Sequence, residues 1–269
     1  MIYISLLFAS AAVVTSAAAD EGNWLPPGSS TEMLKGPPLE FIRPETVRNE
    51  DWLYGRLLFH SPSLLGEKAV RIGLSCNSCH PNGHANTDFF ITGLSDRPGQ
   101  VDVTHHFWKA GFDDGIFNPV NIPSLRGSRD TAPYGTINVL PDLHAFTRHV
   151  IEVEFAGPSP SSEKLEALVV YLNSIDNKEL GNNQSFVKTS SNMSYLPLLR
   201  APLQNRDYAR LRELTDLIRS DFGRRANLPE AQVDRIKSTV AILRTLIVKA
   251  DEGDYTAAFT IYEDLMANQ

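Results

Sequence analysis

A C-x-x-C-H motif at Cys76, Cys79 and His80 constrains this chain more than any other feature of its sequence. The motif contains the only two cysteines among 269 residues. The two-residue spacer places the sulfurs about one helical turn apart, with an imidazole directly after the second sulfur. This pattern is typical of haem c, whose vinyl groups form thioethers with both cysteines while the histidine binds the iron. The motif therefore predicts one covalently attached haem c with His80 as the proximal iron ligand.

Two other chemistries use a similar pair of cysteines. A structural zinc site needs four ligands, often from a second Cys or His pair. Later histidines are present at positions 84, 105 and 106, but no further cysteine follows. A thioredoxin-like redox pair lies at a strand-to-helix junction, whereas the residues around Cys76 and Cys79 are rich in Asn, Gly and Pro. The sequence favours haem and leaves zinc and a redox disulfide as alternatives.

Residues 1–19 contain no charged side chain and end in a run of small residues before Asp20. This pattern predicts a secretory signal peptide, with Ala17 and Ala19 at the positions that a signal peptidase recognises. The usual Lys or Arg near Met1 is missing, and an uncleaved membrane anchor is the alternative. No later stretch is long and apolar enough to span a bilayer. We therefore expect a periplasmic or otherwise exported protein, which agrees with haem c attachment outside the bacterial cytoplasm.

The composition indicates a globular protein without an affinity for nucleic acid. Apolar residues make up 42% of the chain and charged residues 21%, both ordinary values. The formal net charge of -7 disfavours nucleic acid as a partner, because phosphate binding requires a basic face. An acidic surface instead suits a basic redox protein as the partner.

The first two thirds of the chain predict a loop-rich helical domain. Residues 20–45 are rich in Pro and Gly and indicate an extended lead-in. We expect the haem domain to span residues 46–180, with a short helix before Ser61, long loops from Pro81 to Pro141, and two later helices. One of these helices is expected over residues 142–155 with Asp142 as N-cap, and the other over residues 159–175 with Ser159 as cap. A haem would fill much of the core of such a domain.

The rest of the chain, residues 181–269, predicts a small helical module. A polar segment starts at Asn182, and three helical patterns follow it. These patterns are marked by apolar residues at 208–218, 233–247 and 255–266. The last two resemble half of a tetratricopeptide hairpin, but no repeat of that period is present. We expect the module to pack on itself or on the haem domain, and docking of a partner by its helices is a second possibility.

Several segments around the motif resemble one family. They are G-R-L-L-F at 55–59, C-x-x-C-H, P-S-L-R-G at 123–127, T-A-P-Y at 131–134, a helix, and A-L-V-V-Y-L at 167–172. Residues 52 to 175 are thereby similar to the bacterial di-haem cytochrome c peroxidases and the related methylamine-utilisation di-haem enzymes. The resemblance implies a mainly α, cytochrome c-like fold, with Arg126 near the haem propionates and with Pro133 and Tyr134 packed close to the haem ring.

This chain departs from the family pattern in three ways. It has one haem motif, whereas the family has two in two domains. The segment after T-A-P-Y is Gly135 to Asn138 in place of the family's H-D-G-like residues. The position at which a family domain often carries a Met or Tyr iron ligand falls near Val150, which cannot bind iron.

The sixth iron ligand decides the chemistry. His105 and His106 lie between C-x-x-C-H and P-S-L-R-G, where the family's peroxidatic domain has a distal histidine, and they are the leading candidates. His149 is a weaker candidate, followed by Met193 on the polar segment, Tyr134 and an open site. A His/His iron is saturated and suits electron transfer, whereas an open site admits peroxide.

Three functions are therefore compatible with the sequence. The first is a mono-haem c-type cytochrome that transfers electrons to or from a protein partner. The second is a divergent peroxidase or oxidase that reduces hydrogen peroxide. The third is a haem subunit or sensor that acts through its helical tail.

Overall fold

The computed structural model describes residues 27, 28, 30, 38–111, 113–135, 139–177, 194–225 and 228–268. The predicted signal peptide and Met193 lie outside these residues. The described chain is mainly helical, as predicted, with one two-stranded antiparallel sheet. None of the helices in the described ranges has the length and apolar character required to cross a membrane.

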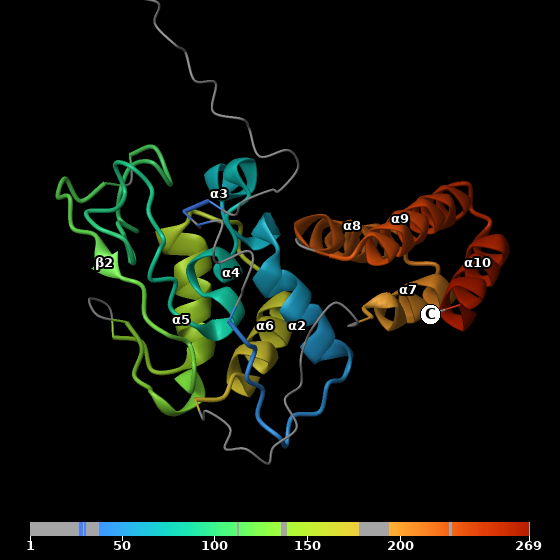
Figure 1. Cartoon of the computed structure of the whole chain (residues 1–269), viewed down its shortest axis with the longest axis horizontal. Helices are drawn as coiled ribbons and strands as arrows, with labels where there is room; N and C mark the ends of the chain where they lie inside the picture. Colours follow the sequence, from blue (N-terminus) through green and yellow to red (C-terminus); the bar gives the residue numbers. More distant parts are fainter. Residues whose placement is uncertain are drawn as a thin grey trace, which may run out of the picture.

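Two helices form the centre of the first part of the molecule. Helix α2 (Glu50–His60) packs along α6 (Ser162–Ser174), and both lie beside the short helix α4 (Cys76–Cys79) in Figure 1. Contact between the two long helices is close at Gly55, where an added Cβ would lie 1.9 Å from the carbonyl oxygen of Ala167. Their apolar faces, including Trp52 and Leu168, are buried. The sequence motif around Gly55 thus serves helix packing.

The remaining elements of this part are short. They are η1 (Pro62–Leu64), α3 (Glu67–Ile72), η2 (Pro81–Gly83), β1 (Gln100–Val101), β2 (Val120–Asn121), η3 (Ser128–Asp130) and α5 (Leu143–His149). In the sheet, Gln100 lies opposite Asn121 and Val101 opposite Val120. Within the described residues from 81 to 141, loops dominate, as the density of Gly, Asp and Pro predicts.

Two details of the predicted helices are wrong. The helix expected over 142–155 ends as an α-helix at His149 and continues as a π-helical turn, η4 (Val150–Glu154). Its predicted N-cap is confirmed, because Asp142 Oδ1 accepts from the backbone N–H of Ala145 at 2.8 Å. The cap of α6 is Ser161, whose hydroxyl accepts from the backbone N–H of Lys164 at 3.3 Å. Ser159 does not cap this helix, because its hydroxyl donates to Glu152 Oε1 at 2.5 Å.

The C-terminal part consists of helices at the other end of the molecule (Figure 1). They are η5 (Leu196–Leu199), α7 (Arg200–Asn205), α8 (Tyr208–Arg224), α9 (Glu230–Asp251) and α10 (Tyr255–Ala267). The three predicted helical patterns correspond to α8, α9 and α10. Asp207 and Asp254 cap α8 and α10, and α9 begins directly after Pro229. Helix α7 was not anticipated.

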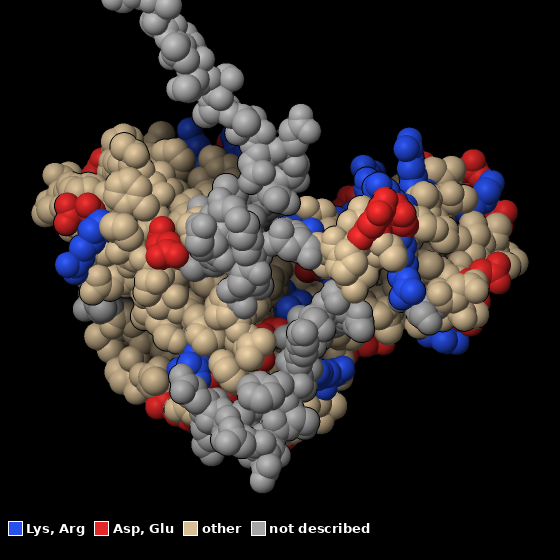
Figure 2. Space-filling view, in the orientation of Figure 1, with Lys and Arg blue, Asp and Glu red and all other residues tan. Residues whose placement is uncertain are grey.

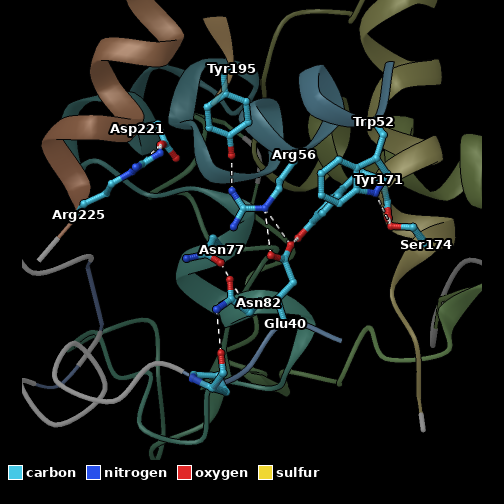
Figure 3. A network of polar contacts seen from close by, with 11 residues as sticks. Glu40, Trp52, Arg56, Asn77, Asn82, Tyr171, Ser174, Tyr195, Asp221 and Arg225 are labelled. Carbon is cyan, nitrogen blue, oxygen red and sulfur yellow. Dashed lines mark hydrogen bonds and ion pairs between the residues drawn. The ribbon is translucent and has the colours of Figure 1, made fainter. Parts of the chain in front are cut away.

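A buried polar cluster joins the two parts, and we name it the Arg56 cluster (Glu40, Arg56, Tyr171 and Tyr195; Figure 3). Arg56 Nε donates to Glu40 Oε1 at 2.9 Å and to Oε2 at 3.1 Å. The Tyr171 hydroxyl donates to Glu40 Oε1 at 2.5 Å, and Arg56 Nη1 donates to the hydroxyl of Tyr195. The carboxylate of Glu40 raises the pKa of Arg56 despite the burial of the guanidinium, which by itself lowers it. The cluster therefore holds one ion pair that is shielded from water.

Residues Pro38–Arg43, a few positions before α2, form an extended segment that we name the strap. Asn82 Nδ2 donates to the carbonyl of Pro38 at 2.8 Å, and His84 Nε2 donates to the carbonyl of Leu39 at 2.9 Å. At the other end of the strap, the Arg43 N–H donates to the carbonyl of Ser174 at 2.8 Å. The end of the predicted lead-in therefore ties the loop after the haem motif to the end of α6.

Candidate haem site

The C-x-x-C-H motif forms a single short helical turn, α4. The backbone N–H of Ser75 donates to the hydroxyl of Ser78 at 3.0 Å, and the N–H of His80 donates to the carbonyl of Cys76 at 2.9 Å. Cys79 is buried, Cys76 is half-buried, and both are free thiols. The turn thus presents two thiols from one helix face and ends at the imidazole.

Both thiols are held in the neutral form. Burial raises the pKa of Cys76 to about 12 and raises that of Cys79 further. Reactive cysteine pairs and zinc-binding cysteines act as thiolates, and such sites lower the thiol pKa. Without a bound group, the environment of Cys76 and Cys79 therefore favours neutral thiols over thiolates. Within the described part of the chain, no group of three or more His, Cys, Asp or Glu side chains is placed to hold a metal ion.

His80 has one ring nitrogen fixed by the backbone. Its Nδ1 lies 2.9 Å from the carbonyl oxygen of Pro123, and because a carbonyl only accepts, Nδ1 carries the proton. Burial lowers the pKa of His80 to about 4, although the hydrogen bond to Pro123 opposes this shift. The ring is therefore neutral at pH 7, with its lone pair on Nε2. An imidazole fixed in this way is a typical metal ligand.

The same contact brings together two motifs that are far apart in the sequence. His80 and Pro123 are separated by 43 positions. Beside them, the backbone N–H of Leu125 donates to the carbonyl of Gly83 at 2.9 Å, and the hydroxyl of Ser124 donates to the same carbonyl at 3.3 Å. The P-S-L-R-G segment therefore packs directly against the loop that follows C-x-x-C-H.

The other residues assigned by the family resemblance lie further along this segment. The guanidinium of Arg126 donates to the carbonyl of Asn177 at 2.8 Å and lies 4.7 Å above the Phe41 ring. Tyr134 donates from its hydroxyl to the carbonyl of Ser128 at 2.7 Å, and its ring stacks on Phe146. Pro133 follows a cis peptide bond. In this structure Arg126 and Tyr134 both bind backbone carbonyls, and their predicted contacts with a haem remain predictions.

His105 and His106 make their contacts within their own loop. The ring of His105 accepts from the backbone N–H of Phe107 at 3.1 Å, and His106 Nδ1 lies 2.7 Å from Asp113 Oδ2. The centroids of the two imidazole rings are 4.0 Å apart, and the His106 side chain is 63% exposed.

His149 lies in a different environment. Its Nε2 is 3.9 Å from Glu154 Oε1, across the π-helical turn η4, and both side chains are largely buried. Burial raises the pKa of Glu154 to about 7, and the charge of Glu154 contributes to the raised pKa of Cys79. Glu154 is thus close enough to interact with both His149 and the second cysteine. Among the three histidines proposed as distal ligands, His149 has the clearest connection to the motif.

The sequence did not reveal several residues that build this site. The carbonyl of Pro123 is a backbone group, which no residue type reveals. The Pro- and Gly-rich sequence of the lead-in does not indicate that the strap binds the loop after the C-x-x-C-H motif. Asn86 is fully buried and donates from Nδ2 to the carbonyl of Ser78 at 2.8 Å, while Asn77 Oδ1 accepts from the backbone N–H of Asn82 at 2.9 Å. The cluster of asparagines around the motif was the available signal, because buried Asn side chains commonly bind loop backbone.

Comparisons with protein-family models, with curated proteins and with solved structures found no match for this chain.

Proposed function

We propose that this chain is an exported mono-haem c-type cytochrome that transfers electrons to or from a protein partner. The observation that carries the proposal is the bond from His80 Nδ1 to the carbonyl of Pro123, next to two neutral thiols on one helical turn. This set of donors fits a haem c. It also links C-x-x-C-H to P-S-L-R-G, the two segments on which the family resemblance rests most.

Each residue of the site has a defined role in this proposal. Cys76 and Cys79 hold the porphyrin through thioethers, and His80 presents Nε2 to the iron while Pro123 fixes the plane and tautomer of the ring. When bound, the haem supplies a one-electron redox centre. Arg126, Pro133 and Tyr134 are proposed to lie at its edge, as the family resemblance implies.

A pair of variants tests haem attachment. The protein is expressed with a haem c maturation system, and covalent haem is measured by the pyridine haemochrome spectrum after denaturation. We expect one haem per wild-type chain and none in Cys76→Ala/Cys79→Ala, while Ser63→Ala, a control on the exposed face of η1, retains the haem. A wild-type protein that lacks haem and instead copurifies with stoichiometric zinc would overturn the proposal.

The sixth ligand separates a carrier from a peroxidase. The ferric spectrum is recorded with and without cyanide and hydrogen peroxide. A low-spin spectrum that neither reagent changes supports the carrier, whereas a high-spin iron that turns over peroxide supports the divergent peroxidase. His149→Ala is compared with His105→Ala and His106→Ala, and the variant that changes the spin state identifies the sixth ligand.

A further inference from the structure

We propose that the loop Asp113–Phe117 is a docking tip for a basic protein partner, with Ile116 and Phe117 as its apolar contact. The inference rests on the proposed electron-transfer function and goes beyond it by naming the surface and the chemistry of the partner. The loop precedes β2, at the left edge of Figure 1, on the side of the molecule away from α10.

Two large apolar side chains are exposed to solvent at this tip. Ile116 is 63% exposed and its neighbour Phe117 is 55% exposed, and Val120 beyond them is 36% exposed. Single exposed apolar residues are ordinary in soluble proteins, whereas adjacent aromatic and aliphatic groups on a projecting loop are typical of contact surfaces. Aromatic residues also carry much of the binding energy in protein interfaces.

A hydrogen-bonded cage holds the base of the tip. Asp102 is buried and accepts from the backbone N–H and the hydroxyl of Thr104, at 3.0 and 2.9 Å, and from the backbone N–H of Asn118. Asn118 Nδ2 in turn donates to Asp114 Oδ2 at 2.9 Å. A loop fixed before binding loses little conformational freedom on contact with a partner. The cage therefore explains how a loop keeps two apolar side chains presented to solvent.

The backbone of the tip is fixed by its own aspartates. The N–H of Gly115 donates to Asp113 Oδ1 at 2.8 Å, and the N–H of Ile116 donates to Asp114 Oδ1 at 2.9 Å. Both aspartate side chains are exposed, and Asp113 Oδ2 also lies 2.7 Å from His106 Nδ1. The apolar contact is thus bordered by two fixed negative charges.

The surrounding segment has the same sign of charge. Among the described residues from 88 to 121, the exposed charged side chains are four aspartates, one arginine and one lysine. Attraction between opposite charges accelerates association and fixes the orientation of the encounter. A basic partner with an apolar centre complements this surface, and an acidic one does not.

The tip leads along the chain to the residue whose carbonyl binds the proposed iron ligand, His80. After Phe117 the chain forms β2 and reaches Pro123, whose carbonyl accepts from His80. Pro123 follows Phe117 by six positions, so their Cα atoms lie within about 22 Å of each other. A partner seated on the tip is therefore held on the same segment that positions the imidazole.

The experiment measures binding of a small basic electron carrier, mitochondrial cytochrome c, at low and at physiological ionic strength. The haem-loaded protein is immobilised, and plant-type ferredoxin serves as the acidic probe. The test variant is Ile116→Ser/Phe117→Ser. The matched control is Val248→Ser, which changes a half-exposed side chain on α9 in the C-terminal helices.

We expect the basic probe to bind the wild type, with an affinity that falls as salt increases. The double variant should weaken binding at least about tenfold, while Val248→Ser changes it less than twofold and ferredoxin does not bind. Equal weakening by the two variants, stronger weakening by Val248→Ser, or no binding of the basic probe overturns the proposal.

Three further outcomes count against the tip as a partner site. One is a wild-type dimer that the double variant dissociates, which assigns the tip to a second copy of the chain. Another is a shift of the haem absorption bands in the double variant, which assigns the two side chains to the haem pocket. The third is preferential binding of ferredoxin.

Binding is also measured with Cys76→Ala/Cys79→Ala, because the tip contains no part of the proposed haem site. If the wild type carries no haem but the tip still binds the basic probe, the proposed function fails and the docking inference stands. If haem is attached and the two loop substitutions have no effect on binding, the docking inference fails alone.

Discussion

The part of the molecule from residue 38 to 177 and the helices from 194 to 268 are stabilised in different ways. In the first part, side chains bind the backbone of long loops, as Asn82, Asn86 and Asp102 do. In the second, apolar stripes on regular helices form the core. The visible face in Figure 2 shows the same contrast, because charged side chains crowd the C-terminal helices while large areas of the first part are uncharged.

This difference indicates what each part needs in order to fold. In the C-terminal helices Leu243 and Leu246 are fully buried, and the buried apolar residues of the two parts form one continuous cluster. The loop-rich part surrounds a motif that we propose to hold a haem, and a bound group stabilises the state to which it binds. The two parts are nevertheless joined by the Arg56 cluster, and the following predictions test how independent they are.

The largest effect is expected from Arg56→Met. The substitution leaves the carboxylate of Glu40 buried without its cation, and removing one member of a buried pair costs about 3–5 kcal/mol of unfolding free energy. Chemical denaturation measures the loss. In Arg71→Met, which breaks a surface pair with Glu67, the loss should stay below about 0.5 kcal/mol. A similar small loss in Arg56→Met would show that the cluster does not join the two parts.

Leu246→Ala is expected to destabilise the C-terminal helices alone. The side chain is fully buried on α9, and its truncation costs about 2–5 kcal/mol. Because α9 packs on α8 and α10, away from the C-x-x-C-H motif, the haem spectrum should not change. Thermal melting followed by circular dichroism and by haem absorbance distinguishes the two parts, with Val248→Ala on the exposed face of α9 as control. A simultaneous loss of both signals would indicate one cooperative unit.

A smaller effect is expected at the start of α6. Ser161→Ala removes the N-cap and should cost about 1 kcal/mol. Ser159→Ala removes the residue that the sequence favoured as the cap, and it should cost less, because its bond to Glu152 is exposed. Urea denaturation of the two variants compares them directly, and an equal loss contradicts the assignment of the cap.

The smallest expected effect is a loss of local stability in the loop Asp113–Phe117 at acidic pH. The pKa values of Asp113 and Asp114 are lowered by hydrogen bonds from the backbone of Gly115 and Ile116. A carboxyl with a lowered pKa stabilises the folded loop above the ordinary aspartate range, and this contribution is lost as the pH falls through the lowered value. Amide exchange at Gly115 and Ile116, referenced to Leu246, should therefore lose protection as the pH falls through the lowered aspartate pKa. Unchanged protection at acidic pH would argue that other contacts hold the tip.

The sequence predictions are most accurate for the regular helices and least accurate for helix ends and loops. Periodicity located α8, α9 and α10 because their apolar stripes are local and regular, and it located α6 for the same reason. It misplaced the cap of α6, because Ser159 and Ser161 are both serines at the start of the helical pattern. The bond from Ser159 to Glu152, which the sequence does not show, leaves Ser161 as the cap. Periodicity also missed the π-helical turn after His149, because apolar spacing does not report a change of helix type over five residues.

The candidate site could be predicted only where chemistry resides in side chains. C-x-x-C-H identifies Cys76, Cys79 and His80 by residue type and spacing. The carbonyl of Pro123 is a backbone group that any residue possesses, so no sequence pattern reveals that it accepts from His80. The buried pair of Glu40 and Arg56 was equally hidden, because charged residues are exposed by default and burial depends on contacts distant in sequence.

The Arg56 cluster also sets the order in which the chain can complete its folding. Glu40 reaches the Tyr171 hydroxyl across 131 positions, and Arg56 reaches Tyr195 across 139. Contacts of such sequence separation form late and slow the folding of a domain. The strap precedes Tyr171 and Tyr195 by more than a hundred positions, so the two hydroxyls can join the pair of Glu40 and Arg56 only once the chain has reached residue 195. A chain that stops before Tyr195 is expected to leave this buried pair incomplete, however well α2 and α6 have formed.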